Sequence, residues 1–240
     1  MSELDETPER DPKLDELLGD VRGEPGPPPE QLDAMFASLS KDIQEAERKP
    51  SFWLKSRSTA MRRAIAIAST LGVLAVGTAL LMQTDRSLFS PLRVVLALGA
   101  LGILLGVSVH QALRPLHAPP APAWTRGLVA ALTVAATFAL ALLPTAEGHT
   151  GGVLDHLVSP CTFIGLLIGL PVYAVLRLLD RTGGAALAGA CAAALAGNLV
   201  LEMHCPHADS VHLMASHFSV ALVFVAGLGL LHLLLARLRR

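Results

Sequence analysis

The sequence predicts an all-α membrane protein, a bundle of six transmembrane helices with both termini in the cytoplasm and a short, acidic, amphipathic-helical N-terminal tail. Three observations predict it. The chain of 240 residues is 52% apolar, with a mean hydropathy of +0.52, which is typical of membrane proteins. Positions 1–50 hold fourteen Asp and Glu against six Lys and Arg, whereas positions 51–240 hold six against thirteen. Six stretches are apolar over about the 20 residues that a helix needs to cross the hydrocarbon.

The tail, residues 1–60, contains two short amphipathic patterns separated by GEPGPPPE at 23–30, which breaks any helix. Neither pattern can form a core alone. We therefore expect the cytoplasmic tail to be partly disordered, and either to remain a solvated tether or to dock its apolar stripes on a basic partner. The stripe residues are Leu14, Leu17, Leu18 and Val21 in the first pattern and Leu32, Met35, Phe36, Leu39 and Ile43 in the second.

The second domain, residues 61–240, holds the predicted spans, because a helix satisfies its own backbone hydrogen bonds in lipid. The fifth span is rich in Ala and Gly and only weakly hydrophobic, so we expect it inside the bundle. Two GxxxG motifs, GILLG at 102–106 and GLLIG at 165–169, predict close packing of helices. The predicted spans are 64–82, 94–113, 127–143, 157–176, 183–203 and 218–235.

Lysine and arginine predict the orientation, because positive residues near span ends are retained in the cytoplasm. With the N-terminus inside, eleven of these residues flank the spans on the cytoplasmic side. Only Arg86 and Arg93 flank them on the other side. Both termini are therefore expected in the cytoplasm.

This orientation places two polar segments, 148–161 and 198–220, in the same extracytoplasmic compartment. Together they contain six of the nine histidines and two of the three cysteines, and neither contains Lys or Arg. A scattered distribution of histidine would not produce this concentration. The residues concerned are His149, His156, His204, His207, His212, His217, Cys161 and Cys205.

Three chemistries suit this cluster, beside plain solvation and helix capping by Asp209 and Ser210. Cys161 and Cys205 form a candidate redox pair in an oxidising compartment. Histidines that titrate near neutral pH could instead sense acidity. Imidazole and thiolate also suit a transition metal, Zn or Cu, and the candidate ligands are His204, Cys205, His207, His212 and His217. The residue pattern leaves these alternatives open.

The stretch PCTFIGLLIGLPVYAVLRLLDRTG and the later AGACAAALAGNLVLEMHCPHADSVHLMASH resemble the second half of the NrsF-like integral-membrane anti-sigma factors of bacteria. The resemblance implies six spans in the bacterial cytoplasmic (inner) membrane and the binding of an extracytoplasmic-function sigma factor, released on a signal. His212 and His217 stand where the family more often has apolar or aromatic residues, which favours a metal signal. The shared residues are Cys161, Pro171, Arg177, His204, Cys205, Pro206, Asp209 and Ser210.

Other functions fit the residues less well. A membrane thiol oxidoreductase normally needs two exchanging cysteine pairs, and this chain has three cysteines and no CxxC. A transporter needs polar groups at the midplane, where only Cys191 is expected. We expect a bundle without intramembrane charge pairs, in which Glu202 and Asn198 hydrogen-bond across helices. The expected function is negative regulation of transcription, without enzymatic activity or direct contact with nucleic acid. Its expected partners are membrane lipid and a cytoplasmic sigma factor, and a transporter or thiol-redox protein is the alternative.

Overall fold

The chain divides into two compact units, Met1–Lys49 and Pro50–Arg240. The stripe residues Leu14, Leu17, Leu18 and Val21, and the histidines His149, His156 and His207, lie outside the described residues. A computed structural model describes residues 28–48, 50–81, 91–115, 118–119, 121–143, 157, 159–180, 186–205, 210–229, 231–232 and 238.

Helix α2, Pro29–Glu47, is the described part of the first unit that carries the second amphipathic pattern. Pro29 opens the helix, where its missing N–H costs no hydrogen bond, and Glu30 in the first turn interacts favourably with the helix dipole. The apolar stripe is exposed along its whole length, at 38–67% of each side chain. The stripe residues are Leu32, Met35, Phe36, Leu39 and Ile43.

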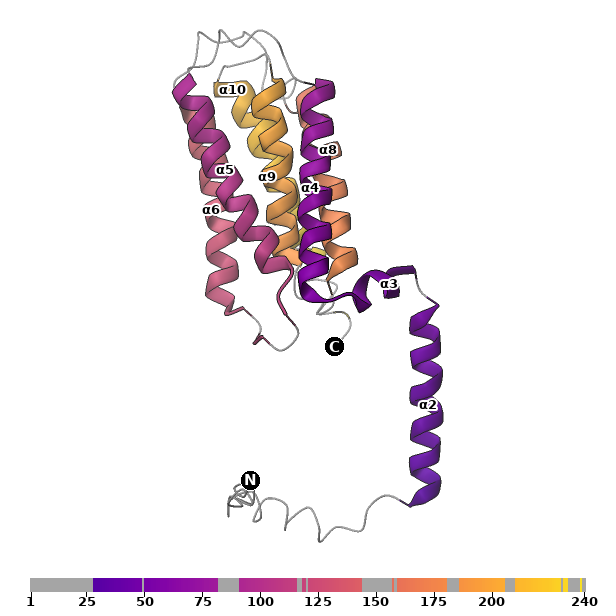
Figure 1. The fold of residues 1–240 in the computed structure, drawn as a ribbon. Helices are drawn as coiled ribbons and strands as arrows, with labels where there is room; N and C mark the ends of the chain where they lie inside the picture. Colours follow the sequence, from indigo (N-terminus) through magenta and orange to yellow (C-terminus); the bar gives the residue numbers. More distant parts are fainter. Residues whose placement is uncertain are drawn as a thin grey trace, which may run out of the picture. The chain divides into compact units, whose positions relative to one another are not determined.

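The second unit contains six helices that are long and apolar enough to cross a membrane, as the sequence predicts. The chain is therefore a multi-pass membrane protein. A short helix, α3 at Pro50–Ser56, precedes them. Figure 1 shows the spans running up and down in turn. They are α4 (Thr59–Leu81), α5 (Pro91–Ala112), α6 (Ala123–Leu142), α8 (Pro160–Leu179), α9 (Ala186–His204) and a sixth composed of α10 (Ser210–His212), η1 (Leu213–Phe218), α11 (Ser219–Leu222) and η2 (Val223–Leu228).

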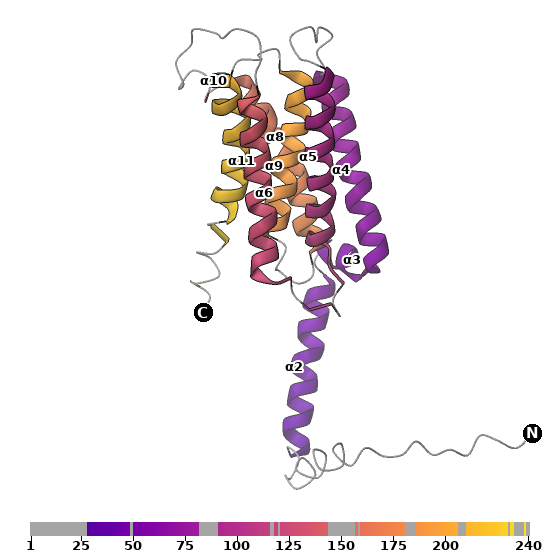
Figure 2. The same cartoon turned by 90° about the vertical axis from the view of Figure 1, so that its left-hand side faces the viewer.

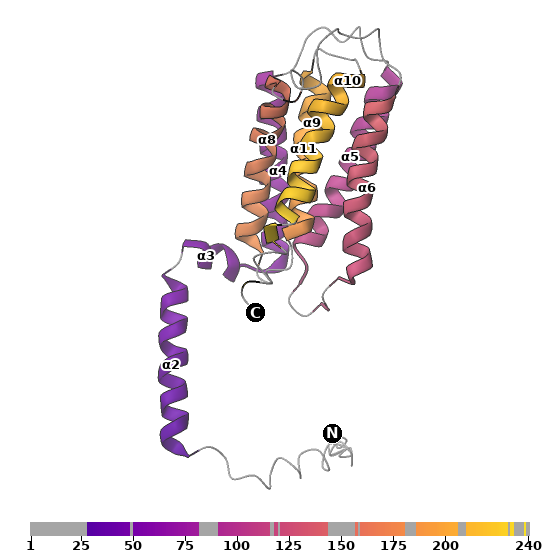
Figure 3. The same cartoon turned by 180° about the vertical axis from the view of Figure 1, so that it is seen from behind.

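Helix α9 occupies the centre of the bundle and packs against α4, α5, α6, α8, α11 and η2 (Figures 1 and 3). Buried residues make up 89% of its most apolar window, against 17–44% for the other five spans. This position explains the weak hydropathy of the fifth predicted span. Its small side chains face other helices and not lipid.

Glycines set the spacing between α8 and α9. A Cβ added at Gly197 would collide with the carbonyl oxygen of Gly165, and one at Gly169 would lie 2.7 Å from that of Ala193. The GLLIG motif at 165–169 therefore brings two backbones together, as predicted. The same prediction for GILLG is wrong among the described helices, because a Cβ at Gly102 or Gly106 would meet nothing within 4 Å.

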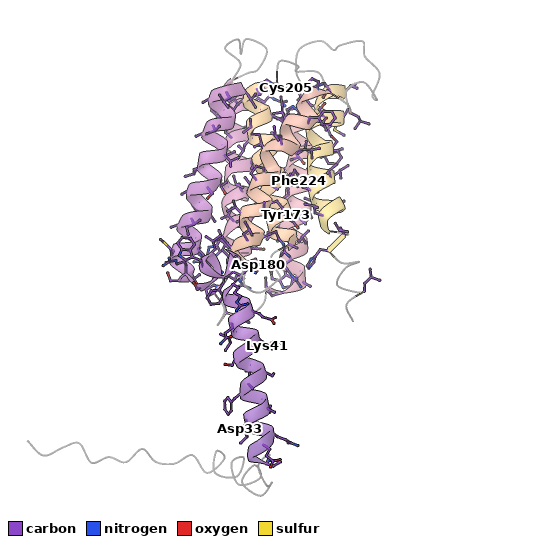
Figure 4. All side chains as sticks on the ribbon, turned by 90° about the vertical axis from the view of Figure 1, so that its right-hand side faces the viewer. Asp33, Lys41, Tyr173, Asp180, Cys205 and Phe224 are labelled. Carbon is purple, nitrogen blue, oxygen red and sulfur yellow. The ribbon has the colours of Figure 1, made fainter. Side chains whose placement is uncertain are left out.

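The two ends of the bundle differ in chemistry. Figure 4 shows Cys205 at one end and Asp180 at the other. We call them the thiol end and the arginine end. At the arginine end, Arg62 donates from Nη1 to the carbonyl oxygen of Leu179 at 2.8 Å, and Arg177 pairs with Asp180 at 2.8 Å. Figures 1 and 2 show α3, the starts of α4 and α6 and the ends of α5 and α8 at this end. These segments and the residues next to them include every lysine and arginine that the structure describes between 50 and 232 except Arg93, namely Lys55, Arg57, Arg62, Arg63, Arg114, Arg126 and Arg177.

The sixth span begins at Ser210, eight residues before the predicted start at 218. The predicted start was wrong because His212 and His217 resemble loop residues in an apolar sequence. Both are instead buried within the span, at 1% and 3% exposure. Two of its segments, η1 and η2, are π-helical, a wide geometry that is frequent at functional sites.

We predict that Gly197→Ala destabilises the bundle, because the added methyl group collides with a backbone carbonyl that cannot move aside. Overpacking lowers the free energy of unfolding by about 1–3 kcal/mol. Each 1 kcal/mol lowers the midpoint of thermal unfolding by about 2–4 °C in a chain of this size. Thermal denaturation of the purified protein in detergent measures this midpoint. Gly102→Ala is the matched control, since its Cβ enters open space. Equal midpoints for the two variants would contradict the close approach of α8 and α9.

Candidate thiol and histidine site

Three ligand atoms converge at the thiol end. Cys161 stands in the first turn of α8, directly after Pro160, and Cys205 follows the last residue of α9, held by a 2.8 Å hydrogen bond from its N–H to the carbonyl of Leu201. The two Sγ atoms lie 3.5 Å apart. His212, at the end of α10, places its Nε2 atom 3.1 Å from the Sγ of Cys205. All three side chains are buried.

The spacing of these atoms suits a metal ion. Both sulfurs and one imidazole nitrogen of His212 lie within 4.8 Å of one another. In a tetrahedral zinc site with Zn–S of about 2.3 Å, two sulfurs are about 3.8 Å apart and a sulfur and a nitrogen about 3.6 Å apart. The observed 3.5 and 3.1 Å fall a few tenths of an ångström short. Two thiolates and one imidazole form a soft donor set, which suits Zn²⁺ or Cu⁺.

The π-helical geometry of η1 brings His217 beside His212. Five residues of α-helix would place the two side chains about 140° apart around the axis, whereas a π turn of about 4.4 residues reduces this to about 50°. The rings of His212 and His217 meet edge to face, with centroids 6.1 Å apart. No sequence pattern predicts this contact, because it depends on the backbone register of η1.

A buried carboxylate continues the cluster. Glu202 Oε1, in the last turn of α9, lies 3.6 Å from Nδ1 of His217 and 3.5 Å from Nη2 of Arg93 in α5. Arg93 also donates from Nη1 to the carbonyl of Leu143 at the end of α6, at 3.4 Å. The expectation of a bundle without charge pairs inside the spans is therefore wrong. The sequence predicts Arg93 in the loop before the second span, but α5 begins at Pro91 and includes it.

No family model, no curated protein and no solved structure matches this chain.

The cluster lies where an ion pair is costly, because each charge gives up water on entering a span. Glu202 offsets this cost through two partners, His217 and Arg93, that come from separate elements. The contacts of Glu202 with Arg93 and His217 therefore tie α5, α9 and η1 together. A search for acidic and basic residues at the same end of predicted spans would have found it.

The other residues singled out in the sequence lie elsewhere. The Nδ1 atom of His204 hydrogen-bonds with the carbonyl of Leu81 at the end of α4, so this ring is engaged away from the two thiols. Asn198 donates to Ala194 in its own helix at 2.9 Å and not across helices, contrary to expectation. Cys191 is fully buried in the middle of α9. His207 lies outside the described residues.

A serine pair ties the same end together. The hydroxyls of Ser159, which precedes α8, and Ser216 in η1 lie 2.8 Å apart and are buried. This bond connects the start of α8 to the sixth span beside the thiols. A change in the distance between Cys161 and His212 would therefore stretch or compress the hydrogen bond between Ser159 and Ser216.

We predict that oxidation joins Cys161 and Cys205 within one chain. Their sulfurs need to move about 1.5 Å closer to reach a bond length of about 2.05 Å, and two thiols pass two electrons and two protons to diamide as the bond forms. After treatment of membranes and denaturation, N-ethylmaleimide should label one cysteine per chain and not three. Cys191→Ser should leave the bond intact. Three labelled cysteines after oxidation would contradict the geometry.

We also predict that Glu202→Gln and Arg93→Met each destabilise the protein by about 3–5 kcal/mol, because each removes one side of the buried ion pair between α9 and α5. The double variant should lose less stability than the sum of the losses in the two single variants. Thermal denaturation in one detergent measures all three variants. Additive losses would show that the two side chains do not interact energetically.

Proposed function

We propose that the chain is an integral-membrane anti-sigma factor that sequesters an extracytoplasmic-function sigma factor through its acidic N-terminal tail. A thiol-reactive or metal signal at the thiol end releases the sigma factor. The observation that carries the proposal is the convergence of Cys161, Cys205 and His212 from α8, α9 and α10, with their ligand atoms within 4.8 Å. A buried, soft donor set at one end of a bundle suits reception of a signal.

The site is placed to alter helix packing when its chemistry changes. A metal ion would set all three ligand distances at once, whereas a disulfide would shorten only the distance between the sulfurs. Either event acts on the contacts of α8, α9 and the sixth span, which also include the Ser159–Ser216 bond and the Glu202–His217 contact. The proposed readout is a change of packing that reaches the arginine end.

The orientation belongs to the same proposal. The arginine end collects nearly all the described cationic residues of the second unit, and positive span flanks are retained in the cytoplasm. The thiol end then faces the extracytoplasmic side of a bacterial inner membrane, where thiols meet oxidants and metal ions from outside the cell. The N-terminal tail lies on the cytoplasmic side, where a sigma factor is found.

The tail has the chemistry that the partner requires. A sigma factor binds DNA through basic surface, and the first fifty residues carry fourteen acidic residues against six basic ones. Helix α2 adds an exposed apolar stripe with the spacing of helix-in-groove recognition. Charge complementarity would bring the partner to the tail, and the stripe would hold it.

The test is purification of the full-length protein from membranes of its own host, with sigma factors identified by mass spectrometry. A sigma factor should be retained, and should be released by diamide or by Zn²⁺ or Cu⁺. Phe36→Asp should abolish retention, whereas Ala34→Asp, with the same charge on the opposite side of α2, should not.

The thiol variants separate reception of the signal from binding. Cys161→Ser with Cys205→Ser should still retain the sigma factor but fail to release it under treatment, and Cys191→Ser should behave as the unmodified protein. A chain that retains no sigma factor before treatment would overturn the proposed function. Release that survives the loss of both cysteines would exclude the thiol end as the receiver.

A further inference from the structure

A groove between α4 and α5 lies on the membrane-facing surface, close to the arginine end. It has a volume of ≈ 310 Å³ and its walls include Ile67 and Leu71 of α4 and Gly102 and Gly106 of α5. Ile67 and Leu71 are more than half exposed. Gly102 and Gly106 are the pair from the GILLG motif at which an added Cβ would meet nothing within 4 Å. Because a groove inside the hydrocarbon does not stay empty, lipid or another protein segment must fill it.

Two donors lie at the mouth of this groove. Arg63 of α4 and His110 of α5 line it together with the apolar residues. Arg63 donates from Nε to the carbonyl of Leu113 at 3.2 Å, which closes α4 onto the end of α5. This hydrogen bond uses Nε, which leaves the two terminal amino groups of Arg63 for a ligand.

The dimensions of the groove match one leaflet. Arg63 and Leu71 are eight residues apart along α4, and Gly102 and His110 are eight apart along α5. At 1.5 Å per residue, both walls extend about 12 Å from the donors into the bundle surface. Half of a hydrocarbon core of about 30 Å is about 15 Å. A lipid phosphate beside Arg63 would therefore direct an acyl chain along the glycines.

Charge distinguishes this groove from two others on the same unit. One of these grooves is lined by Leu157 and residues of the sixth span, and the other by residues of α8 and the sixth span. Neither lining contains a lysine, arginine or histidine. Basic pockets between spans bind anionic headgroups. Among these three grooves, only the α4–α5 groove has basic residues at its mouth.

A second copy of the chain is the competing occupant, because exposed GxxxG motifs support helix dimers. A symmetric contact through α5 would bring two Arg63 side chains and two His110 side chains toward each other. The two guanidinium groups, brought together in a poorly solvated place, repel each other. An anionic lipid instead neutralises Arg63.

We propose that the α4–α5 groove is a binding site for one anionic phospholipid, with its phosphate on Arg63 and His110 and one acyl chain against Gly102 and Gly106. The site would couple the position of α4 and α5 to the lipid composition of the membrane. It is independent of the thiol end and of any sigma factor.

Native mass spectrometry of the full-length protein in detergent, with dioleoyl phosphatidylglycerol or dioleoyl phosphatidylcholine added, tests the proposal. The two lipids have identical chains, so the comparison isolates the headgroup. The phosphatidylglycerol adduct should be retained about 5-fold more strongly. Arg63→Gln should remove this preference, whereas Arg126→Gln, at the same end on α6 and outside the groove, should keep it.

Gly106→Leu tests the acyl-chain part of the site, because its side chain enters the groove where no atom lies within 4 Å. It should abolish the bound lipid while leaving the melting midpoint unchanged, which shows that the variant folds. Equal retention of both lipids, or an unchanged preference in Arg63→Gln, would overturn the proposal. So would a dimer that Gly106→Leu dissociates, because a second copy would then be the occupant.

Discussion

The close approach of the α8 and α9 backbones is the contact on which the rest of the bundle depends. Lipid tails are as apolar as leucine, so helices gain little by exchanging lipid contacts for one another and must gain from tight packing. Gly165 and Gly197 permit that packing where any side chain would collide. Cys161 lies one turn from the first glycine, and Cys205 about two turns from the second. The distance between the sulfurs is therefore set by backbone packing deeper in the membrane.

The sixth span takes part in both halves of the thiol end. His212 faces the two sulfurs, and His217 faces the carboxylate that pairs with Arg93. The contact between the two rings joins these halves into one connected cluster. Because these side chains are buried, charge on any member is felt strongly by its neighbours. The chemistry of the thiols and the stability of the ion pair cannot be treated as separate properties.

The architecture could be predicted from the sequence because membrane spans obey a length rule, and an alternating path of six spans places Cys161 and Cys205 at one end. The details of the site could not. Nothing in the residues 213–218 marks the wide helical turn that joins His212 to His217, since its register depends on packing. Glu202 and Arg93 are distant in the sequence, and Arg93 falls just outside the predicted span, which starts at 94, whereas α5 starts at Pro91. GILLG and GLLIG are equivalent as patterns, but only the packing partners decide which one is covered.

The π segments give the sixth span a property that a uniform α-helix lacks. Each wide turn accommodates one residue more than an α turn does, so relaxing η1 to α geometry would shift the following chain by one position. One position corresponds to about 100° of rotation and about 1.5 Å of rise. A change of geometry at η1 would thus reach the other end of the sixth span chiefly as a rotation of one helix, with a smaller shift along its axis.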